Sequence, residues 1–599
     1  MITKITFYSL ILLLVIFAGL LNNDYFYQTT SIAYYGFCIS SVAFVIVTQS
    51  RFNQNKNFEI TKPFLYFFIW CLYILFHYQF LGGSSGIVIY YTIHFLFICS
   101  ASELFRIKYL SYKILINGVI GFATLESLYC ISQYFGWLNS LNSFFKVTGS
   151  WNNPNVTGIF LALTTPFFYY SFSKKLKKFY FICFITLLIA LYLLKCRTAF
   201  IGILVTAIVY FVLEYDLINW NKIKKNRFVI ILILIVSVVV LIPTFNLLYN
   251  SKKSSADGRK LIWKISTKMV IEKPLFGYGY GSFEKEYNLA QILFIEKGNI
   301  TEDEMQNAGY VILPHNEILQ NAVEGGLFGL ILIFLFIRSL IISIKERKKE
   351  IIEIEQNPEN KYQRFNFAYA GVIAFTIMSM FNFATQGIPV MTMLSLYAAI
   401  IISQSSTIPL PKGISNKFQI CTFSFQISKI ILCLFLLFSL VLTAKIDRQN
   451  KKADLLKNDR KYNEALQILC KIQTDVKQNP DYWKNLASIN FKLNNYAAAI
   501  SSIKKAKVSS TNPELFLGAG ICYEKMGQYP SAINEFRNLV NSKPSKFKYR
   551  FLLMQAYLQN NDSLNAIKTA QGILDLQPKI PSRKVQYYKK MANKVITHS

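Results

Sequence analysis

Long apolar blocks separated by short polar loops constrain this chain more than any other feature. A helix needs about 20 mainly apolar residues to cross the hydrocarbon core of a bilayer. With 53% hydrophobic and only 16% charged residues, the chain is too apolar for a soluble enzyme, a collagen or a disordered tail. We therefore expect an all-α, polytopic membrane helix bundle of 12 to 13 spans. The candidate spans lie near residues 5–21, 31–47, 64–81, 86–101, 112–135, 156–172, 179–194, 198–213, 228–248, 317–343, 366–386, 388–403 and 427–444.

The loops predict an orientation for this bundle, because short cytoplasmic loops are enriched in Lys and Arg. Basic clusters occur in alternate loops, near residues 51–62, 106–113, 174–178, 222–227 and 345–349. The opposite short loops are poor in positive charge, and the loop 136–155 carries only Lys146. We predict a cytoplasmic N-terminus and an external segment 249–315. An odd thirteenth span then places the C-terminal region outside, whereas fusion of the short pair around Gly387 would return it to the cytoplasm.

The formal charge of +32 is spread over these loops and over the C-terminal third of the chain. No basic DNA-binding or RNA-binding motif accompanies it. We interpret the charge as membrane orientation and contact with anionic partners, including membrane lipids, and expect no nucleic acid partner.

An internal repeat begins where the chain becomes polar. Four alanines are spaced by 34, 33 and 34 residues, at Ala465, Ala499, Ala532 and Ala566. Prolines mark the ends of the units, at Pro480, Pro513, Pro544 and Pro578. The array resembles tetratricopeptide repeats, which stack helical hairpins into a solenoid with a concave surface. We predict a membrane domain over 1–445 and a domain of about four repeats over 446–599. The repeats suit a protein partner, and a purely structural scaffold suits the pattern equally well.

Two basic residues stand at a predicted outer turn, against the orientation rule. Lys195 and Arg197 interrupt the apolar sequence between residues 179 and 213. Charged groups beside spans are functional candidates, and a planar guanidinium binds phosphate in a bidentate manner. We predict that Arg197, assisted by Lys195, binds a phosphate or diphosphate group. The alternative is an arginine that only reaches the membrane interface.

The external segment carries two further features. Arg259 precedes an amphipathic stretch, residues 261–270, which we expect to lie along the membrane surface. Gly277, Gly279 and Gly281 permit tight turns and close approach of the backbone to a ligand, although no strand-turn-helix unit surrounds them. The acidic run 302–304 is compatible with a cation site, but a solvated acidic surface is the simpler interpretation.

His315 is one of four histidines and stands before a long apolar helix. Imidazole accepts a proton near neutral pH, as a general base must. The sequence alone leaves two roles for His315, capping of the helix and catalysis.

Five motifs occur in the order seen in the O-antigen ligase family. They are Ser150-Trp151-Asn152-Asn153-Pro154-Asn155, the turn at Arg197, Arg259 with Trp263, the glycine stretch from Pro274 to Phe283, and Pro314-His315-Asn316-Glu317 with Glu324-Gly325-Gly326-Leu327. The chain thus resembles this superfamily of lipid-linked glycan transferases, which also includes O-antigen polymerases and bacterial protein O-oligosaccharyltransferases. The resemblance covers about 150–345 by motif and about 1–445 by the arrangement of spans, and leaves the repeats outside.

The resemblance implies a GT-C-like membrane enzyme that transfers a glycan from an undecaprenyl-diphosphate carrier to an acceptor hydroxyl. The reaction takes place on the periplasmic face of the bacterial inner membrane, without a metal ion, a nucleotide sugar or a cofactor. His315 corresponds to the family's base, and Arg197 and Arg259 to diphosphate-binding residues. The residues expected to bind substrate are Lys195, Asn153, Asn155, Gly279, Asn316 and Glu317.

Several acceptors fit this chemistry. Lipid A core or another surface glycolipid makes the protein an O-antigen ligase. A protein acceptor recruited by periplasmic repeats makes it a protein O-oligosaccharyltransferase, and a growing glycan makes it a polymerase. A transporter or a membrane anchor that presents the repeats belongs to a different class, but the sequence shows no clear repeated halves or midplane charges of the kind typical of transporters.

Overall fold

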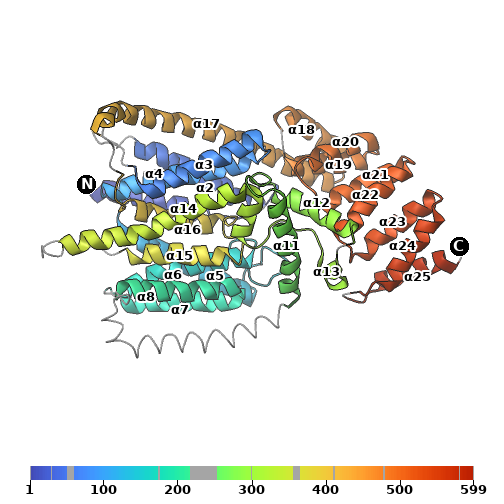
Figure 1. Cartoon of the computed structure of the whole chain (residues 1–599), viewed down its shortest axis with the longest axis horizontal. Coiled ribbons are helices and arrows are strands. Elements are labelled where there is room, and N and C mark those ends of the chain that lie inside the picture. Colours follow the sequence, from blue (N-terminus) through green and yellow to red (C-terminus); the bar gives the residue numbers. More distant parts are fainter. Residues whose placement is uncertain are drawn as a thin grey trace. The chain divides into compact units, whose positions relative to one another are not determined.

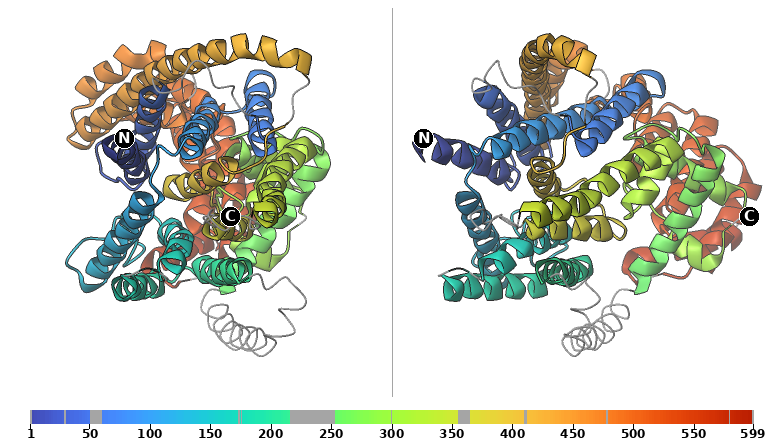
Figure 2. Two further views of the ribbon diagram at one scale, coloured as in Figure 1. Left: turned by 90° about the vertical axis from the view of Figure 1, so that its left-hand side faces the viewer. Right: turned by 60° about the vertical axis from the view of Figure 1, so that its left-hand side comes forward.

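The computed structural model describes residues 2–28, 30–49, 60–172, 174, 176–215, 253–298, 300–354, 365–408, 412–476, 479–578 and 580–597. Helices dominate this part of the chain, which contains no β-strand (Figures 1 and 2). The chain divides into two compact units. The first comprises Met1–Asn250 and His315–Ala444, and the second Ser251–Pro314 and Lys445–Ser599. The predicted span 228–248 and the basic cluster 222–227 lie outside the described residues.

The first unit is a bundle of apolar helices. They are α1 (Ile2–Ala18), α2 (Ser31–Gln49), α3 (Lys62–Phe80), α4 (Ser85–Arg106), α5 (Tyr112–Phe135), α6 (Pro154–Ser171), α7 (Lys177–Leu194), α8 (Arg197–Glu214), α14 (Glu317–Ile354), α15 (Asn366–Ser379), α16 (Ile388–Ile402) and the first part of α17 (Lys412–Asn458). Within the described residues, eight helices are long and apolar enough to cross a membrane, and α1, α15 and α16 are shorter apolar helices. Every predicted span in the described part corresponds to a helix, which confirms the all-α polytopic fold.

Burial distinguishes the centre of this bundle from its periphery. Every residue of α16 is buried, as is almost every residue of α6. By contrast, α7, α14 and α17 expose large apolar side chains, among them Ile182, Phe334 and Phe438. Large exposed apolar surfaces are expected where lipid replaces water as the solvent. The bundle therefore has a central pair of helices surrounded by helices suited to contact lipid.

Five connections bring several helix ends to one face of the bundle. The chain reverses direction between α1 and α2, α3 and α4, α5 and α6, α7 and α8, and α15 and α16. We call the face formed by these five connections and the start of α14 the site face. It is the face that the charge pattern predicts to be external.

The long helix α14 is kinked soon after it leaves the site face. Gly326 has φ 60° and ψ −161°, which is outside the helical region. The hydroxyl of Tyr73 donates to the carbonyl of Gly325 at 2.8 Å. A positive φ is accessible to glycine without a Cβ penalty, so the double glycine at 325–326 fits a bend that sequence periodicity does not reveal.

The second unit contains a solenoid of helical hairpins. After the end of α17, it runs through α18 (Tyr462–Ile472), the 3-10 helix η1 (Gln473–Asp475), α19 (Pro480–Lys492), α20 (Tyr496–Lys507), α21 (Pro513–Lys525), α22 (Tyr529–Ser542), α23 (Phe547–Gln559), α24 (Ser563–Asp575) and α25 (Arg583–Thr597). The four periodic alanines are fully buried in the second helix of each hairpin. The predicted tetratricopeptide-type solenoid is therefore confirmed.

The hairpin turns repeat the same backbone geometry. A left-handed residue follows the first helix of each unit, at Arg460, Asn494, Gly527 and Asn561. The next N–H in each turn bonds back to a helix carbonyl, for example from Asn495 to Asn490 at 2.9 Å. This is the pattern of a helix C-cap, and it satisfies carbonyls that the helix leaves open. The buried alanine and the turn residue therefore both recur with the period of the repeat.

The predicted external segment forms three helices in this second unit: α11 (Lys253–Glu272), α12 (Phe283–Glu296) and α13 (Glu302–Asn307) (Figure 1). The amphipathic stretch of α11 does not lie free for a membrane surface, because Leu261, Ile265 and Met269 are at most 2% exposed. This helix packs on α12 and α13.

Helix α12 in turn packs on the repeats. Ile292 belongs to a core cluster with Phe516 and Phe536. The carboxylate of Glu284 accepts from the Thr511 N–H at 3.0 Å and from the hydroxyls of Ser510 and Thr511 at 3.2 Å. The domain boundary predicted between residues 445 and 446 stays a prediction. The compact second unit includes residues from both sides of that boundary.

We predict that Glu284→Ala loosens the α11 to α13 segment from the repeats. The change leaves the polar groups of Thr511 without their carboxylate acceptor, at a cost of about 1–3 kcal/mol. Limited proteolysis of the purified protein should then cut residues 297–310 about tenfold faster. Glu286→Ala is the matched control, because Glu286 pairs with its neighbour Lys285 at 3.3 Å. Equal cleavage rates for the two variants would contradict the prediction.

Candidate active site

The loop between α15 and α16, residues 380–387, connects the predicted site residues of the first unit. The side-chain amide of Asn382 donates to Thr198 Oγ1 at 3.4 Å. The ring of the next residue, Phe383, lies 5.2 Å from the ring of His315. This loop therefore brings the start of α8, where Arg197 stands, and the start of α14 to the same place on the site face.

The same loop holds the carboxylate of Glu317. Thr385 donates its backbone N–H to Glu317 Oε1 at 2.8 Å and its hydroxyl to Oε2 at 2.7 Å. The predicted span 366–386 is correspondingly too long, since α15 ends at Ser379. The apolar residues that follow, such as Phe381, continue the hydropathy signal, but Asn382 and Thr385 make their hydrogen bonds from a loop.

His315 has a left-handed backbone, with φ 55°. Such a conformation is uncommon for a residue with a Cβ, and histidine is enriched there together with Asn and Asp. Capping of α14 is performed by Asn316, whose Oδ1 accepts from the Leu319 N–H at 3.0 Å. The imidazole is thus not the cap of this helix, and its half-buried ring lies against Phe383.

Arg197 is the first residue of α8, and Lys195 ends α7 in a left-handed conformation with φ 51°. Arg197 is half-buried, whereas Lys195 is exposed. Cys196 between them is buried. A Cβ added at Gly158 would lie only 2.8 Å from the Cβ of Cys196. This close approach fixes the turn against α6.

The segment before α6 forms a second ordered part of the site face. Asn153 caps α6 by accepting from the Asn155 N–H at 2.9 Å. The Ser150 N–H donates to the buried carboxylate of Glu126 at 2.7 Å. Glu126 is not among the predicted site residues, although an acidic residue within the apolar segment 112–135 is a signal of a functional or structural role.

Gly149 is the critical position in this segment. Its φ is 73°, and a Cβ there would lie 2.3 Å from Glu126 Oε1 and 2.6 Å from Thr157 Cγ2. The neighbouring backbone is fixed as well, because Gln133 Oε1 accepts from the N–H groups of Thr148 at 2.9 Å and Gly149 at 2.8 Å. Only glycine fits both the backbone and the space.

We predict that Gly149→Ala lowers thermal stability more than Gly136→Ala. Gly136 has φ 79° but has no atom within 4 Å of the added Cβ. Both changes therefore cost about 1–2 kcal/mol of left-handed strain, whereas the change at Gly149 also displaces Glu126. Thermal unfolding in detergent measures the difference, and equal losses would show that the contacts around Gly149 are unimportant.

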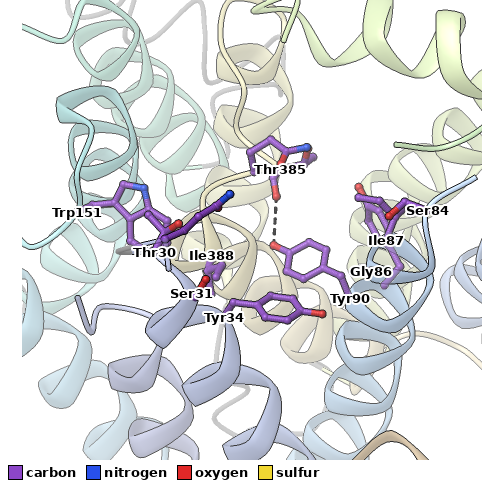
Figure 3. Close-up of a pocket in the computed structure, with 13 residues that line it drawn as sticks. Thr30, Ser31, Tyr34, Ser84, Gly86, Ile87, Tyr90, Trp151, Thr385 and Ile388 are labelled. Atoms are coloured by element: carbon purple, nitrogen blue, oxygen red, sulfur yellow. Dashed lines mark hydrogen bonds between the residues drawn. The ribbon is translucent and has the colours of Figure 1, made fainter. Parts of the chain in front are cut away.

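A cavity of about 350 Å³ opens at the site face beside these residues (Figure 3). This cavity is not predictable from the sequence, because its walls come from four connections that are separate in the chain. The hydroxyl of Tyr90 in its wall donates to the carbonyl of Thr385 at 3.1 Å. The lining residues are Gln28, Thr30, Ser31, Tyr34, Ser84, Gly86, Ile87, Tyr90, Tyr91, Trp151, Thr385, Gln386 and Ile388.

The other predicted site residues belong to the second unit. Arg259 is half-buried on α11, one turn before Trp263. The indole of Trp263 donates to the carbonyl of Pro314 at 3.0 Å. Pro314 belongs to the same unit as Trp263 and directly precedes His315 in the chain.

The glycine stretch forms a turn between α11 and α12. Gly277, Gly279 and Gly281 all have positive φ, with 103° at Gly279. Tyr278 between them donates its hydroxyl to Glu272 Oε2 at 2.9 Å. Burial, and then this bond to Glu272, raise the pKa of Tyr278, so the phenol remains a donor. The glycines thus serve a tight turn, and binding of substrate by Gly279 stays a prediction.

The acidic run 302–304 forms the first turn of α13. Thr301 and Glu304 make a reciprocal capping box, and Glu304 also pairs with Lys264 at 2.6 Å. Burial raises the pKa of Glu304, but the bonds from Lys264 and Thr301 outweigh it and lower the pKa overall. Among the described residues, no group of three His, Cys, Asp or Glu side chains is arranged to hold a metal ion.

Comparison with known proteins agrees with the motif resemblance. The family model described as O-antigen ligase matches residues 182–334. This range contains Lys195, Arg197, Arg259, Gly279 and the His315 motif, and it excludes Asn153 and Asn155. The chain is thus similar to O-antigen ligases over its central part, and the family supports a glycosyltransferase of the ligase or polymerase type.

Comparison with curated proteins found no match. Among solved structures, the crystal structure of the yeast Tom70 matches with 12% identity and a TM-score of 0.24, over 73% of this chain and 92% of that chain. This likeness is too weak to carry an argument, and the repeats are therefore established from their own hairpins and period.

Proposed function

We propose that this protein is an O-antigen ligase-type glycosyltransferase. It moves a glycan from an undecaprenyl-diphosphate carrier to a hydroxyl of lipid A core or another surface glycolipid. The reaction takes place on the periplasmic face of the inner membrane. The observation that carries the proposal is the contact of adjacent loop residues, Asn382 and Phe383, with Thr198 beside Arg197 and with His315.

In the proposed reaction, the acceptor oxygen attacks the anomeric carbon of the donor sugar. The bond from that carbon to the diphosphate oxygen breaks, and undecaprenyl diphosphate leaves. His315 takes the proton of the acceptor hydroxyl, as a general base. Arg197 and Arg259 neutralise the charge of the diphosphate, where charge-assisted hydrogen bonds are strongest.

The remaining residues have supporting roles in this proposal. Asn316 and Glu317 fix the backbone that presents His315, through the helix cap and the bonds to Thr385. Asn153 fixes the start of α6 in the same way. Substrate contacts of Lys195, Asn155 and Gly279 are the further expectation, and the exposed side chain of Lys195 is compatible with an anionic ligand.

The second unit supports an external position for the repeats. A membrane cannot pass through a compact folded unit, so Ser251–Pro314 and Lys445–Ser599 share one side of it. The external segment carries Arg259, which the reaction needs on the periplasmic side. The repeats are then periplasmic too, in agreement with the count of thirteen spans.

A protein acceptor is the second candidate, because the repeats share a compact unit with the segment that carries Arg259. Helical repeats present extended binding surfaces, so they suit the recruitment of a protein near the reaction. This reading makes the enzyme a protein O-oligosaccharyltransferase with unchanged chemistry.

We predict that His315→Ala lowers glycan transfer by about 10²–10⁴-fold, the usual contribution of a general base. Arg197→Ala and Arg259→Ala should each lower it by about 10²–10³-fold, as the loss of transition-state charge stabilisation does. Transfer from purified undecaprenyl-diphosphate glycan in detergent is the measurement. Lys113→Ala removes an exposed cation at the opposite end of the bundle and serves as the control. Any variant that retains wild-type transfer removes its residue from the site.

We predict that a chelator leaves transfer unchanged, because the proposed charge stabilisation comes from arginine. The assay compares lipid A core with periplasmic protein acceptors, each with and without chelator. Product on lipid supports the ligase, product on protein supports the second candidate, and lipid-linked glycan that grows longer indicates a polymerase. Loss of activity that a divalent cation restores would refute the arginine mechanism.

A further inference from the structure

The cavity at the site face is lined mainly by uncharged polar residues. Of its 13 lining residues, all of which the structure describes, none is charged. Ten carry a hydroxyl, an amide or an indole N–H, and only Gly86, Ile87 and Ile388 lack a polar side-chain atom. Tyr34, Tyr90, Tyr91 and Trp151 supply four aromatic rings. Figure 3 shows Thr30 and Trp151 on one side, Ser84 and Ile87 on the other, and Tyr34 and Tyr90 between them.

This lining selects one class of ligand. A diphosphate is bound most strongly by cationic side chains such as arginine, and the lining has no cation. A lipid chain needs apolar walls, because polar groups without partners are costly. A saccharide offers hydroxyls that both donate and accept, and its C–H faces pack on aromatic rings. Hydroxyl and amide side chains match the first property, and the tyrosine and tryptophan rings match the second.

The size and position of the cavity agree with this class. A volume of about 350 Å³ lies at the lower end of small-molecule sites, which span about 300–1,000 Å³. That is room for a short saccharide. Thr385 connects the wall to the proposed base region, since it accepts from Tyr90 and donates twice to Glu317, two residues after His315.

We propose that this cavity is a carbohydrate-binding subsite, which holds a saccharide unit beside the loop 380–387. The inference rests on the proposed function, because it names where the glycan portion of a substrate binds. The saccharide comes either from the lipid-linked donor or from the acceptor, and the chemistry of the lining is the same for both. Trp151 then has a role within the Ser150 to Asn155 motif, as the aromatic wall of the subsite.

Gly86 gives a direct test. It lines the cavity, is exposed, and a Cβ there would meet nothing closer than Ser84 Oγ at 3.6 Å. Gly86→Trp therefore adds an indole at the cavity wall, and its Cβ meets no backbone atom of another segment within 4 Å. Gly121→Trp is the matched control, because Gly121 on α5 is also exposed and has open space around its added Cβ. Gln386→Ala is a milder second variant that removes one exposed amide from the rim.

Two measurements separate this inference from the proposed function. Saturation-transfer NMR detects binding of two soluble probes, the glycan released from the donor by mild acid and the delipidated core oligosaccharide. Steady-state transfer gives KM for the donor and for the acceptor. We expect Gly86→Trp to weaken one probe more than tenfold and to raise KM for the matching substrate. Gln386→Ala should weaken the same probe about 3- to 10-fold, and Gly121→Trp should change neither.

The outcomes decide between the sources. Loss confined to the released glycan assigns the subsite to the donor, and loss confined to the core oligosaccharide assigns it to the acceptor. A probe that binds wild type but not Gly86→Trp upholds the subsite even when no transfer is found, in which case only the proposed function fails. Wild-type affinity for both probes in Gly86→Trp and Gln386→Ala overturns the inference, as does the absence of binding to wild type.

Discussion

The site face depends on the pairing of one carboxylate with one threonine. Glu317 stands at the start of a long apolar helix, where an uncompensated charge would be costly. Thr385 satisfies both of its oxygens, through its N–H and its hydroxyl. This pairing fixes the loop 380–387, and the loop in turn places Phe383 against His315 and Asn382 against Thr198. The cavity depends on the same residue, because Tyr90 bonds to the Thr385 carbonyl.

Much of the fold follows from the sequence, because hydropathy and repeat period are averages over many residues. The helices of the bundle and the hairpins of the solenoid have this origin, and the period also places the turn residues Asn494 and Asn561. The ends and bends of individual helices are harder to predict from the sequence. Helix α15 ends at Ser379 although the next residues are apolar, and α14 bends at Gly326 within an apolar run. Each of these features lies beside a hydrogen bond to a residue distant in sequence, between Thr385 and Glu317 in one case and between Gly325 and Tyr73 in the other.

The sequence predicts which residues belong to the candidate site, but it does not predict how the fold brings them together. Motif order nominates His315, Arg197 and Arg259 as site residues, and their roles stay predictions. Motif order does not show whether His315 or Asn316 caps α14, because both residues precede this helix and either side chain suits a cap. The geometry assigns the cap to Asn316. Glu126 and the cavity are not predictable from the motifs for a different reason. Glu126 acts through a backbone N–H 24 residues away, and the cavity exists only once separate connections have met.

The repeats pack against the segment that carries Arg259, so they are not a domain attached only by a flexible linker. Without the repeats, α12 would expose Ile292 and would lose the partners of Glu284 and Gln291. A domain on a flexible linker leaves no such unsatisfied surface when it moves away. The segment and the solenoid therefore fold as one unit, even though the membrane spans separate them in sequence. Trp263 of this unit also donates to the carbonyl of Pro314, so the same folded unit holds the last residue of the segment before His315.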